Sequence, residues 1–303
     1  MHRPVLYHEI ISFLQPRRGG KFVDCTVGAG GHAWGILQAS QPDGCLLGLD
    51  VDPQAIGLAR EHLAVFGSRV ILMRASYTQL AEQLAIVSWK EVQGILLDLG
   101  VSSIQLDTVQ RGFSFQVDAP LDMRFNPDTP TTAADLVNQL PEGELASLFF
   151  RYGEVRRSRQ VARAIVRSRP IQTTRQLVEI VTPAVGRRLQ KIHPATQVFQ
   201  ALRIAVNGEL DAIETVLPQA VQMLAKGGRL AVISFHSLED RIIKNYFRQE
   251  SRDCICPPEQ PQCTCGHRAV LGVVTSKPVR PTQAETSENP RSRSARLRVT
   301  EKL

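Results

Sequence analysis

The segment Phe22-Val23-Asp24-Cys25-Thr26-Val27-Gly28-Ala29-Gly30-Gly31-His32-Ala33 decides the fold of this 303-residue chain. A short run of β-prone apolar residues leads directly into a cluster of glycines, and helix-compatible residues follow at 34–39. This order predicts a strand, a tight turn and the start of a helix. Glycines allow positive φ, and they let a ligand approach main-chain N–H groups without a Cβ in the way. An ordinary strand-to-helix turn would use the same residues, so a second signal has to decide.

An acidic residue, Asp50, supplies that second signal. It ends the next apolar run, residues 45–49, about 20 residues beyond the first glycine. At this spacing a carboxylate receives the ribose hydroxyls of a nucleoside in a doubly wound sheet, so the sequence predicts a nucleoside-containing cofactor. The pattern Gly28-x-Gly30-x-x-Ala33 matches the dinucleotide fingerprint and favours NAD. Asp24, which precedes the glycines, favours S-adenosylmethionine. The glycines alone leave both cofactors open.

Composition sets the outer bounds on function. Hydrophobic residues make up 43% of the chain, as in a soluble globular protein. No run approaches the roughly 20 apolar residues of a membrane helix. The N-terminus, residues 1–4, has no apolar signal region, so we expect a cytoplasmic protein without membrane association. The net charge of +7 indicates a polyanionic partner. The sequence leaves a homodimer open.

Strands alternate with helices at both ends of the chain, which predicts an α/β fold with a mostly parallel sheet. Ligands bind beyond the carboxyl ends of the strands in such a sheet. Asp98 ends the expected fourth strand and His236 follows the fifth, so both are expected at the cleft of the glycine turn. A turn-capping aspartate and a helix-capping histidine are the alternatives. We expect helices at 6–14, 53–66, 77–89, 209–224 and 236–250, and strands at 45–49, 70–73, 94–100, 229–235 and 270–275.

The alternation stops between residues 104 and 205, where the sequence shows no convincing buried strand. Helical patterns at 131–150, 155–167, 175–181 and 195–206 predict an all-helical insertion. We therefore expect the first part of the α/β domain at 1–105, the insertion at 106–206 and the second part at 207–303. The insertion opens with an irregular loop, residues 113–125, that carries aromatics, an arginine and Asp122. Such loops at the ligand edge of a sheet often face the substrate.

Positive charge gathers in the insertion, with seven arginines between residues 151 and 169. On a helix over 155–167, steps of three and four residues place four of them in one stripe: Arg156, Arg159, Arg163 and Arg167. No acidic residue follows Glu154 until Glu179. A solvated helix face normally mixes both signs of charge, so the stripe favours contact with nucleic-acid phosphates.

Four of the six cysteines fall within twelve positions near the C-terminus: Cys254, Cys256, Cys263 and Cys265. Disulfides are disfavoured in a cytoplasmic chain. Paired thiols with His267 nearby suggest a structural zinc site. The C-x-C pairs depart from the usual C-x₂₋₄-C spacing, so the residues leave metal binding open. Cys25 and Cys45 lie in expected strands and are interpreted as small core residues.

Seven motifs together carry a family resemblance: His2-x-x-Val5-Leu6-x-x-Glu9, Asp24-Cys25-Thr26-x-Gly28-x-Gly30-Gly31-His32, Leu49-Asp50-x-Asp52-Pro53, Asp98-Leu99-Gly100-Val101-Ser102-Ser103-x-Gln105, Pro120-Leu121-Asp122-Met123-Arg124, Ser234-Phe235-His236-Ser237-Leu238-Glu239-Asp240-Arg241 and Asn289-Pro290-Arg291-Ser292-Arg293-Ser294. With them the chain resembles the bacterial small-subunit rRNA methyltransferase H family, also called MraW. The resemblance covers the chain from residue 2 to its last strand. It neither supports nor excludes zinc at the cysteines.

The resemblance implies a class I methyltransferase fold, Rossmann-like and dependent on S-adenosylmethionine, with an all-helical inserted domain for RNA recognition. It implies methyl transfer to the exocyclic N4 of one cytidine in the decoding region of 16S rRNA, within the small ribosomal subunit. The implied cofactor contacts are Gly30, Gly31 and His32 at the glycine turn, Asp50 at the ribose, Tyr77 near the adenine, and Asp98 and Gln105 near the reacting end.

The chemistry of this reaction fits the residues. A cytosine amino nitrogen is a poor nucleophile because its lone pair is delocalised into the ring. An enzyme must hold it in line with the methyl group and offer an acceptor to the departing proton. Asp98, Asp122 and His236 are the candidate acceptors. The base must also leave its stack, and the aromatics of the 113–125 loop could receive it. An NAD-dependent oxidoreductase and a non-catalytic ribosome-assembly factor that binds RNA are the alternative functions.

Overall fold

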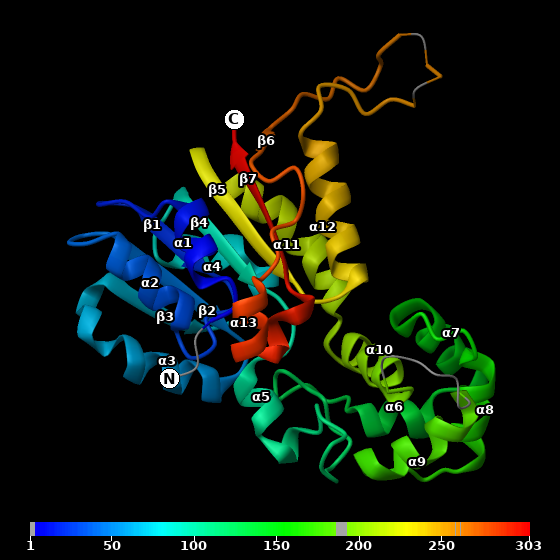
Figure 1. Cartoon of the computed structure of the whole chain (residues 1–303). Helices are drawn as coiled ribbons and strands as arrows, with labels where there is room; N and C mark the ends of the chain where they lie inside the picture. The colour runs from blue at the N-terminus through cyan, green and yellow to red at the C-terminus, as the bar shows by residue number, and fades with distance from the viewer. Residues whose placement is uncertain (1–3, 186–192, 258, 261) are drawn as a thin grey trace. The chain divides into compact units, whose positions relative to one another are not determined.

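The computed structural model describes residues 4–185, 193–257, 259–260 and 262–303 (Figure 1). The chain divides into two compact units. The sheet unit contains the residues up to Gly100 together with Leu210–Leu303, and the helical unit is Val101–Glu209. None of the helices in the described residues is long and apolar enough to span a membrane.

The sheet unit is built on seven strands in the order β3-β2-β1-β4-β5-β7-β6. The first five strands along the chain pair in parallel, whereas β7 pairs antiparallel with both β5 and β6. This confirms the expected α/β fold with a mostly parallel sheet. Strand order reverses between β1 and β4, which is where such sheets form their ligand crevice. The strands are β1 (Lys21–Asp24), β2 (Cys45–Asp50), β3 (Val70–Arg74), β4 (Val92–Asp98), β5 (Leu224–Ser234), β6 (Leu271–Val273) and β7 (Arg296–Lys302).

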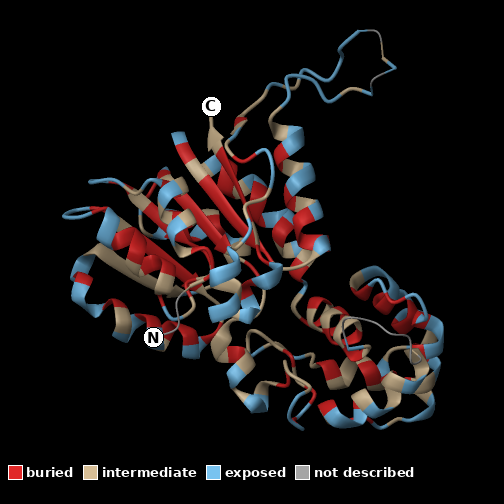
Figure 2. Ribbon diagram, in the orientation of Figure 1, coloured by how far each residue is buried: buried red, intermediate tan, exposed pale blue. Residues whose placement is uncertain are grey.

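Helices cover both faces of this sheet because successive strand residues point to opposite sides. Leu47 and Leu97 pack in one buried cluster with α4, α11 and α12, while their neighbours Leu46 and Leu96 pack in another with α1, α2 and α3. Figure 2 shows the central strands buried between these layers. The helices of the sheet unit are α1 (Tyr7–Leu14), α2 (Gly31–Ala39), α3 (Pro53–Leu63), α4 (Leu80–Ile86), α11 (Glu209–Met223), α12 (Ser237–Glu250) and α13 (Gln283–Glu288).

The helical unit has a hydrophobic core of its own. Leu145, Phe149, Val161 and Leu202 are among its fully buried side chains. Residues 101–185 and 193–209 contain no β-strand, only an isolated bridge between Pro120 and Thr173. Its helices are α5 (Ser103–Asp107), α6 (Ala133–Gln139), α7 (Glu142–Gly153), α8 (Ser158–Arg167), α9 (Thr174–Val185) and α10 (Ala195–Asn207).

Two expected helices of this unit show the most informative differences in their bounds. The single helix expected at 131–150 is divided into α6 and α7, because Pro141 forces the residue before it out of helical geometry. Leu140 accordingly has φ −66° and ψ 139°. The helix expected at 155–167 begins only at Ser158, since Glu154 ends α7 with a left-handed φ of 52°. Arg156 therefore lies in a turn, outside the helix that carries the other arginines of the expected stripe.

Bounds in the sheet unit also differ from expectation, most clearly for two elements. The helix expected at 77–89 is a 3₁₀ turn, Tyr77–Gln79, followed by the shorter α4. The fifth strand was expected at 229–235 but begins at Leu224, because the glycine pair after Lys226 forms an irregularity inside β5 rather than a turn before it.

Adjacent phenylalanines of α7 test the core of the helical unit. Phe149 is fully buried, whereas Phe150 is 64% exposed. We expect Phe149→Ala to reduce the free energy of unfolding by about 3–5 kcal/mol, because it removes buried apolar surface and leaves a cavity. The matched control Phe150→Ala should change it by less than about 0.5 kcal/mol. Urea unfolding followed by circular dichroism measures both, and equal losses would contradict this core.

Candidate active site at the carboxyl edge of the sheet

The glycine turn joins the end of β1 to the start of α2. Gly28 and Gly30 have φ of 53° and 85°, in the left-handed region that side chains with a Cβ rarely adopt. At Gly31 the obstacle is space, since a Cβ there would lie 2.4 Å from the Cγ of Pro4. The Gly30 N–H donates to the Val27 carbonyl at 2.7 Å and closes the turn. The predicted strand, turn and helix start are therefore present.

Asp50 at the end of β2 is tied directly to this turn. Its Oδ2 accepts a hydrogen bond from the Gly28 N–H at 3.0 Å, and its Oδ1 accepts one from the Asp52 N–H at 2.9 Å. Burial raises the pKa of Asp50 to about 6, against the lowering effect of these two backbone donors. Each carboxylate oxygen can accept a further hydrogen bond, as two ribose hydroxyls would require.

Asp24 at the end of β1 is a further candidate site residue, which the sequence alone does not single out. The sequence marked it only as the acid that precedes the glycines. In the structure its carboxyl is buried beside those of Asp50 and Asp98, and its Oδ1 accepts from the Thr26 N–H at 3.2 Å. Burial raises its pKa to about 7. Asp98 and Asp50 raise it further, whereas His32 and the Thr26 N–H lower it. The sequence signal that marks it is its position at the end of an expected strand, directly before the glycine turn.

His32 and Asp98 face each other across the glycine turn. The His32 Nε2 lies 3.7 Å from the Asp98 Oδ2, and only 5% of the His32 side chain is exposed. The Asp98 N–H donates to the Thr26 Oγ1 at 2.7 Å, which ties the end of β4 to the turn. Within the described part of the chain, neither ring nitrogen of His32 nor the Asp98 Oδ1 has a hydrogen-bond partner. Buried polar atoms without partners are costly, so these atoms fit a polar ligand at this edge.

Tyr77 and His236 lie at the same edge of the sheet unit. Tyr77 begins the 3₁₀ turn that follows β3, and it packs partly against the core. His236 follows β5 and caps α12, because its Nδ1 accepts from the Glu239 N–H at 3.4 Å. The Glu239 carboxylate accepts in return from the His236 N–H at 3.1 Å. The capping role raised for His236 is therefore present, and its catalytic role stays a prediction.

Two of the expected site residues belong to the helical unit. Gln105 is buried and caps α5, with its Oε1 accepting from the Ser102 N–H at 3.1 Å. Asp122 forms a two-point ion pair with Arg124, at 2.9 and 2.7 Å. Partial burial raises the pKa of Asp122, but its hydrogen bonds with Arg124 outweigh this effect and hold the pKa below its ordinary value. The contact of Gln105 with cofactor and the proton-accepting role of Asp122 remain predictions.

The aromatic loop and the arginines also lie in the helical unit. Phe113 and Phe125 stack at 5.6 Å, and Phe115 packs edge-on against Phe199 at 5.0 Å. On α8, Arg159, Arg163 and Arg167 are exposed at successive helical turns. Only Arg163 among these three has a described partner, Glu142, at 3.4 Å.

The raised pKa of Asp24 makes the stability of the sheet unit depend on pH. Because its pKa of about 7 lies above the ordinary 3.8, the folded protein holds this proton more tightly than the unfolded chain does. The resulting stabilisation is complete below pH 4 and is lost as the pH rises through 7. The free energy of unfolding of the wild-type protein should fall between pH 5 and 8. In Asp24→Asn we expect this fall to be smaller by on the order of 3 kcal/mol.

Urea unfolding at the two pH values measures this difference. Asp211→Asn, at an exposed position of α11, serves as the matched control and should keep the wild-type pH dependence. An unchanged pH dependence in Asp24→Asn would show that the Asp24 carboxyl does not titrate in this range.

Known proteins match the chain from end to end. A model of the MraW methylase family matches residues 1–303. Three curated relatives carry the name ribosomal RNA small subunit methyltransferase H. The relative from Dehalococcoides mccartyi (strain ATCC BAA-2266) is 50% identical over 302 residues, covering 100% of this chain and 86% of the relative. The relative from Geobacter sulfurreducens is 52% identical over 307 residues, covering 100% of this chain and 99% of the relative. The relative from Thermomicrobium roseum is 49% identical over 305 residues, covering 100% of this chain and 94% of the relative. The resemblance seen in the motifs is confirmed, and the chain belongs to the MraW methylase family.

Proposed function

We propose that this protein transfers a methyl group from S-adenosylmethionine to the exocyclic N4 of a cytidine in the decoding region of 16S rRNA, within the small ribosomal subunit. The observation that carries the proposal is about 50% identity, over the whole chain, to relatives named for methyl transfer to small-subunit rRNA. An enzyme with this substrate works in the cytoplasm. Family membership also decides between the two cofactors left open by the glycines, in favour of S-adenosylmethionine over NAD.

The carboxyl edge of the sheet fits this cofactor. S-adenosylmethionine supplies an electrophilic methyl group on a positively charged sulfonium. The Gly30–Gly31 backbone gives close approach, Asp50 offers oxygens to the ribose, and Tyr77 offers a ring face to the adenine. Asp24, Asp50 and Asp98 place three carboxyls at one edge, and a cation favours their ionised forms. Buried acids with raised pKa values are therefore suited to a cationic ligand.

Among the candidate proton acceptors, the contacts of this chain favour Asp98. Asp122 is held in its ion pair with Arg124, which makes its carboxylate a weaker base. The Nδ1 of His236 already accepts from the Glu239 N–H. Asp98 ends a central strand beside the glycine turn and keeps one oxygen without a hydrogen bond among the described residues. We therefore assign it the role of receiving the amino proton, or of orienting the amino group toward the methyl.

The helical unit would hold the RNA. Its exposed Arg159, Arg163 and Arg167 on α8 present planar donors, Arg163 pairs with Glu142, and arginine-rich surfaces of this kind bind phosphates. The target cytidine must leave its stack to reach a methyl group, and the half-buried Phe113 and Phe125 offer aromatic faces for it.

A methyl-transfer assay tests the function as a whole. The substrate is small ribosomal subunits purified from a strain that lacks this enzyme, and the methyl donor carries a radioactive label. We expect label in 16S rRNA at the N4 of one cytidine, located by nuclease digestion and mass spectrometry. RNA binding without label would favour the non-catalytic assembly factor instead.

Asp50 tests the cofactor site. We expect Asp50→Ala to weaken S-adenosylmethionine binding by about 1.5–3 kcal/mol, the range for hydrogen bonds to a charged group. Isothermal titration calorimetry measures the affinity. Glu214→Ala, at an exposed position of α11, is the control and should bind normally. Unchanged affinity in a folded Asp50→Ala protein would remove Asp50 from the site.

The arginines of α8 test RNA docking separately from catalysis. We expect the Arg159→Ala/Arg167→Ala double variant to bind rRNA more weakly, with a salt slope shallower by about one to two units, because fewer counterions are released. Its affinity for S-adenosylmethionine should not change. Asp98→Ala should show the opposite pattern, with methyl transfer sharply reduced and RNA binding near normal. An unaltered salt slope in the double variant would place the RNA surface elsewhere, with the basic segment Arg291–Arg298 as the next candidate.

A further inference from the structure

The loop that joins α12 to β6 has almost nothing apolar to hold it. Every described residue between 251 and 270 is exposed or half-buried. Its base is closed by two hydrogen bonds, from the Val270 N–H to the Glu250 carbonyl at 2.9 Å and from the Ala269 N–H to the Asp253 Oδ1 at 3.3 Å. Beyond that base, ordering the loop costs conformational entropy that apolar burial does not offset. A segment of this kind needs a cross-link.

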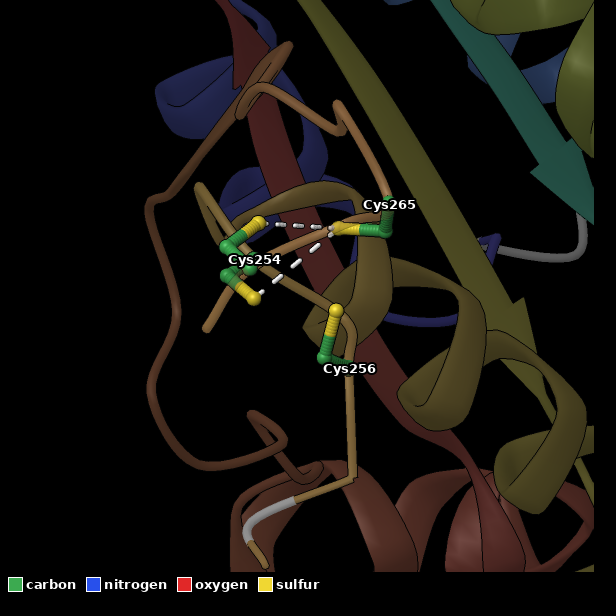
Figure 3. Close-up of side chains that lie close together, drawn as sticks. Cys254, Cys256 and Cys265 are labelled. Atoms are coloured by element: carbon green, nitrogen blue, oxygen red, sulfur yellow. Dashed lines mark hydrogen bonds between the residues drawn. The ribbon is translucent and has the colours of Figure 1, made fainter. Parts of the chain in front are cut away.

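Four thiols converge inside this loop. Cys254 and Cys256 come from its outgoing limb, and Cys263 and Cys265 come from its returning limb. All four Sγ atoms lie within 4.8 Å of one another. The Cys263 and Cys265 sulfurs are 3.6 Å apart, and the Cys265 and Cys254 sulfurs are 3.8 Å apart. Figure 3 shows the sulfurs of the labelled Cys254, Cys256 and Cys265 turned toward one another.

These separations match a tetrahedral metal site. With a Zn–S bond of about 2.3 Å, neighbouring sulfurs of a four-thiolate zinc centre lie about 3.8 Å apart. A disulfide would bring two sulfurs to about 2.05 Å, and all four cysteines are free thiols in the structure.

The geometry points to a zinc ion held by Cys254, Cys256, Cys263 and Cys265, in a closed structural site separate from the glycine turn. Four thiolates complete the ligand set of such a site and leave no open position for catalysis. Soft sulfur ligands select zinc over magnesium or calcium. Binding releases the thiol protons and ties the two limbs together, so the metal supplies the cross-link that the loop lacks.

The surroundings of the cluster support a metal centre. The His267 N–H donates to the Cys265 Sγ at 3.5 Å, the kind of backbone contact that stabilises a coordinated thiolate. The His267 ring is used differently, because its Nε2 lies 3.2 Å from the Gln249 carbonyl at the end of α12. The histidine singled out in the sequence therefore fastens the loop to the helix and leaves coordination to the four sulfurs.

Metal analysis of the full chain tests this site. The protein is produced without a histidine tag, kept reduced, and dialysed against metal-free buffer before elemental analysis. We expect about one equivalent of zinc per chain, and close to none in Cys256→Ser and Cys265→Ser. The matched control is Cys45→Ser, which removes a thiol from β2 outside the cluster and should keep its zinc.

Cobalt substitution of the wild-type chain gives a second measurement that does not depend on whether the variants fold. We expect the intense visible bands of a tetrahedral Co²⁺ centre with four thiolates, and their loss when zinc is added. Bound iron in place of zinc would overturn the proposal. Two disulfides in protein purified under reducing conditions would also overturn it, as would four thiols that react freely with Ellman's reagent in the presence of zinc.

Discussion

The parallel pairing of β1 between β2 and β4 is the constraint on which the site depends. Asp24 pairs with Gly48 on one side and with Leu96 on the other. Asp50 and Asp98 each stand two residues beyond those partners, so this register places both on the same face of the sheet as Asp24 and nearer the carboxyl edge. The Val27 N–H continues the pairing by donating to the Leu49 carbonyl at 2.9 Å. The glycine turn is thus fixed to the neighbouring strand before any ligand arrives.

This arrangement reduces the stability of the fold. Three carboxyls at adjacent strand ends repel one another when ionised, and burial raises the pKa values of Asp24 and Asp50. The partly unpaired His32 and Asp98 add the cost of buried polar atoms. The apolar layers on both faces of the sheet offset these costs. Locally unfavourable groups held by a favourable scaffold are typical of functional sites.

Much of this could be predicted from the sequence. The positions of the glycines, Asp50 and Asp98 in the fold could be predicted, because turn formation and strand ends depend on local sequence. The bounds of helices differ from the prediction where single residues interrupt a helical pattern. Pro141 divides one continuous pattern into two helices, and Glu154 in a left-handed conformation leaves Arg156 outside α8. The buried state of Asp24 could not be predicted and the convergence of the four thiols stayed open, because both depend on residues brought together by folding. The capping bonds of Gln105 and His236 likewise could not be assigned from the sequence, since the same residue types occur in helix caps and in functional sites.

The position of the helical unit in the chain has a consequence for biosynthesis. β4 is complete at Asp98, but its partner β5 begins only at Leu224. While the ribosome makes the residues between them, the apolar Ile95-Leu96-Leu97 edge has no neighbour on that side. At about 5–20 residues per second this interval lasts on the order of ten seconds. The helical unit, whose core draws on its own residues, can fold during that time. Early folding of the helical unit shortens the chain segment that must close into a loop when β5 pairs with β4. It thereby shortens the period in which the nascent chain exposes an unpaired, aggregation-prone strand edge.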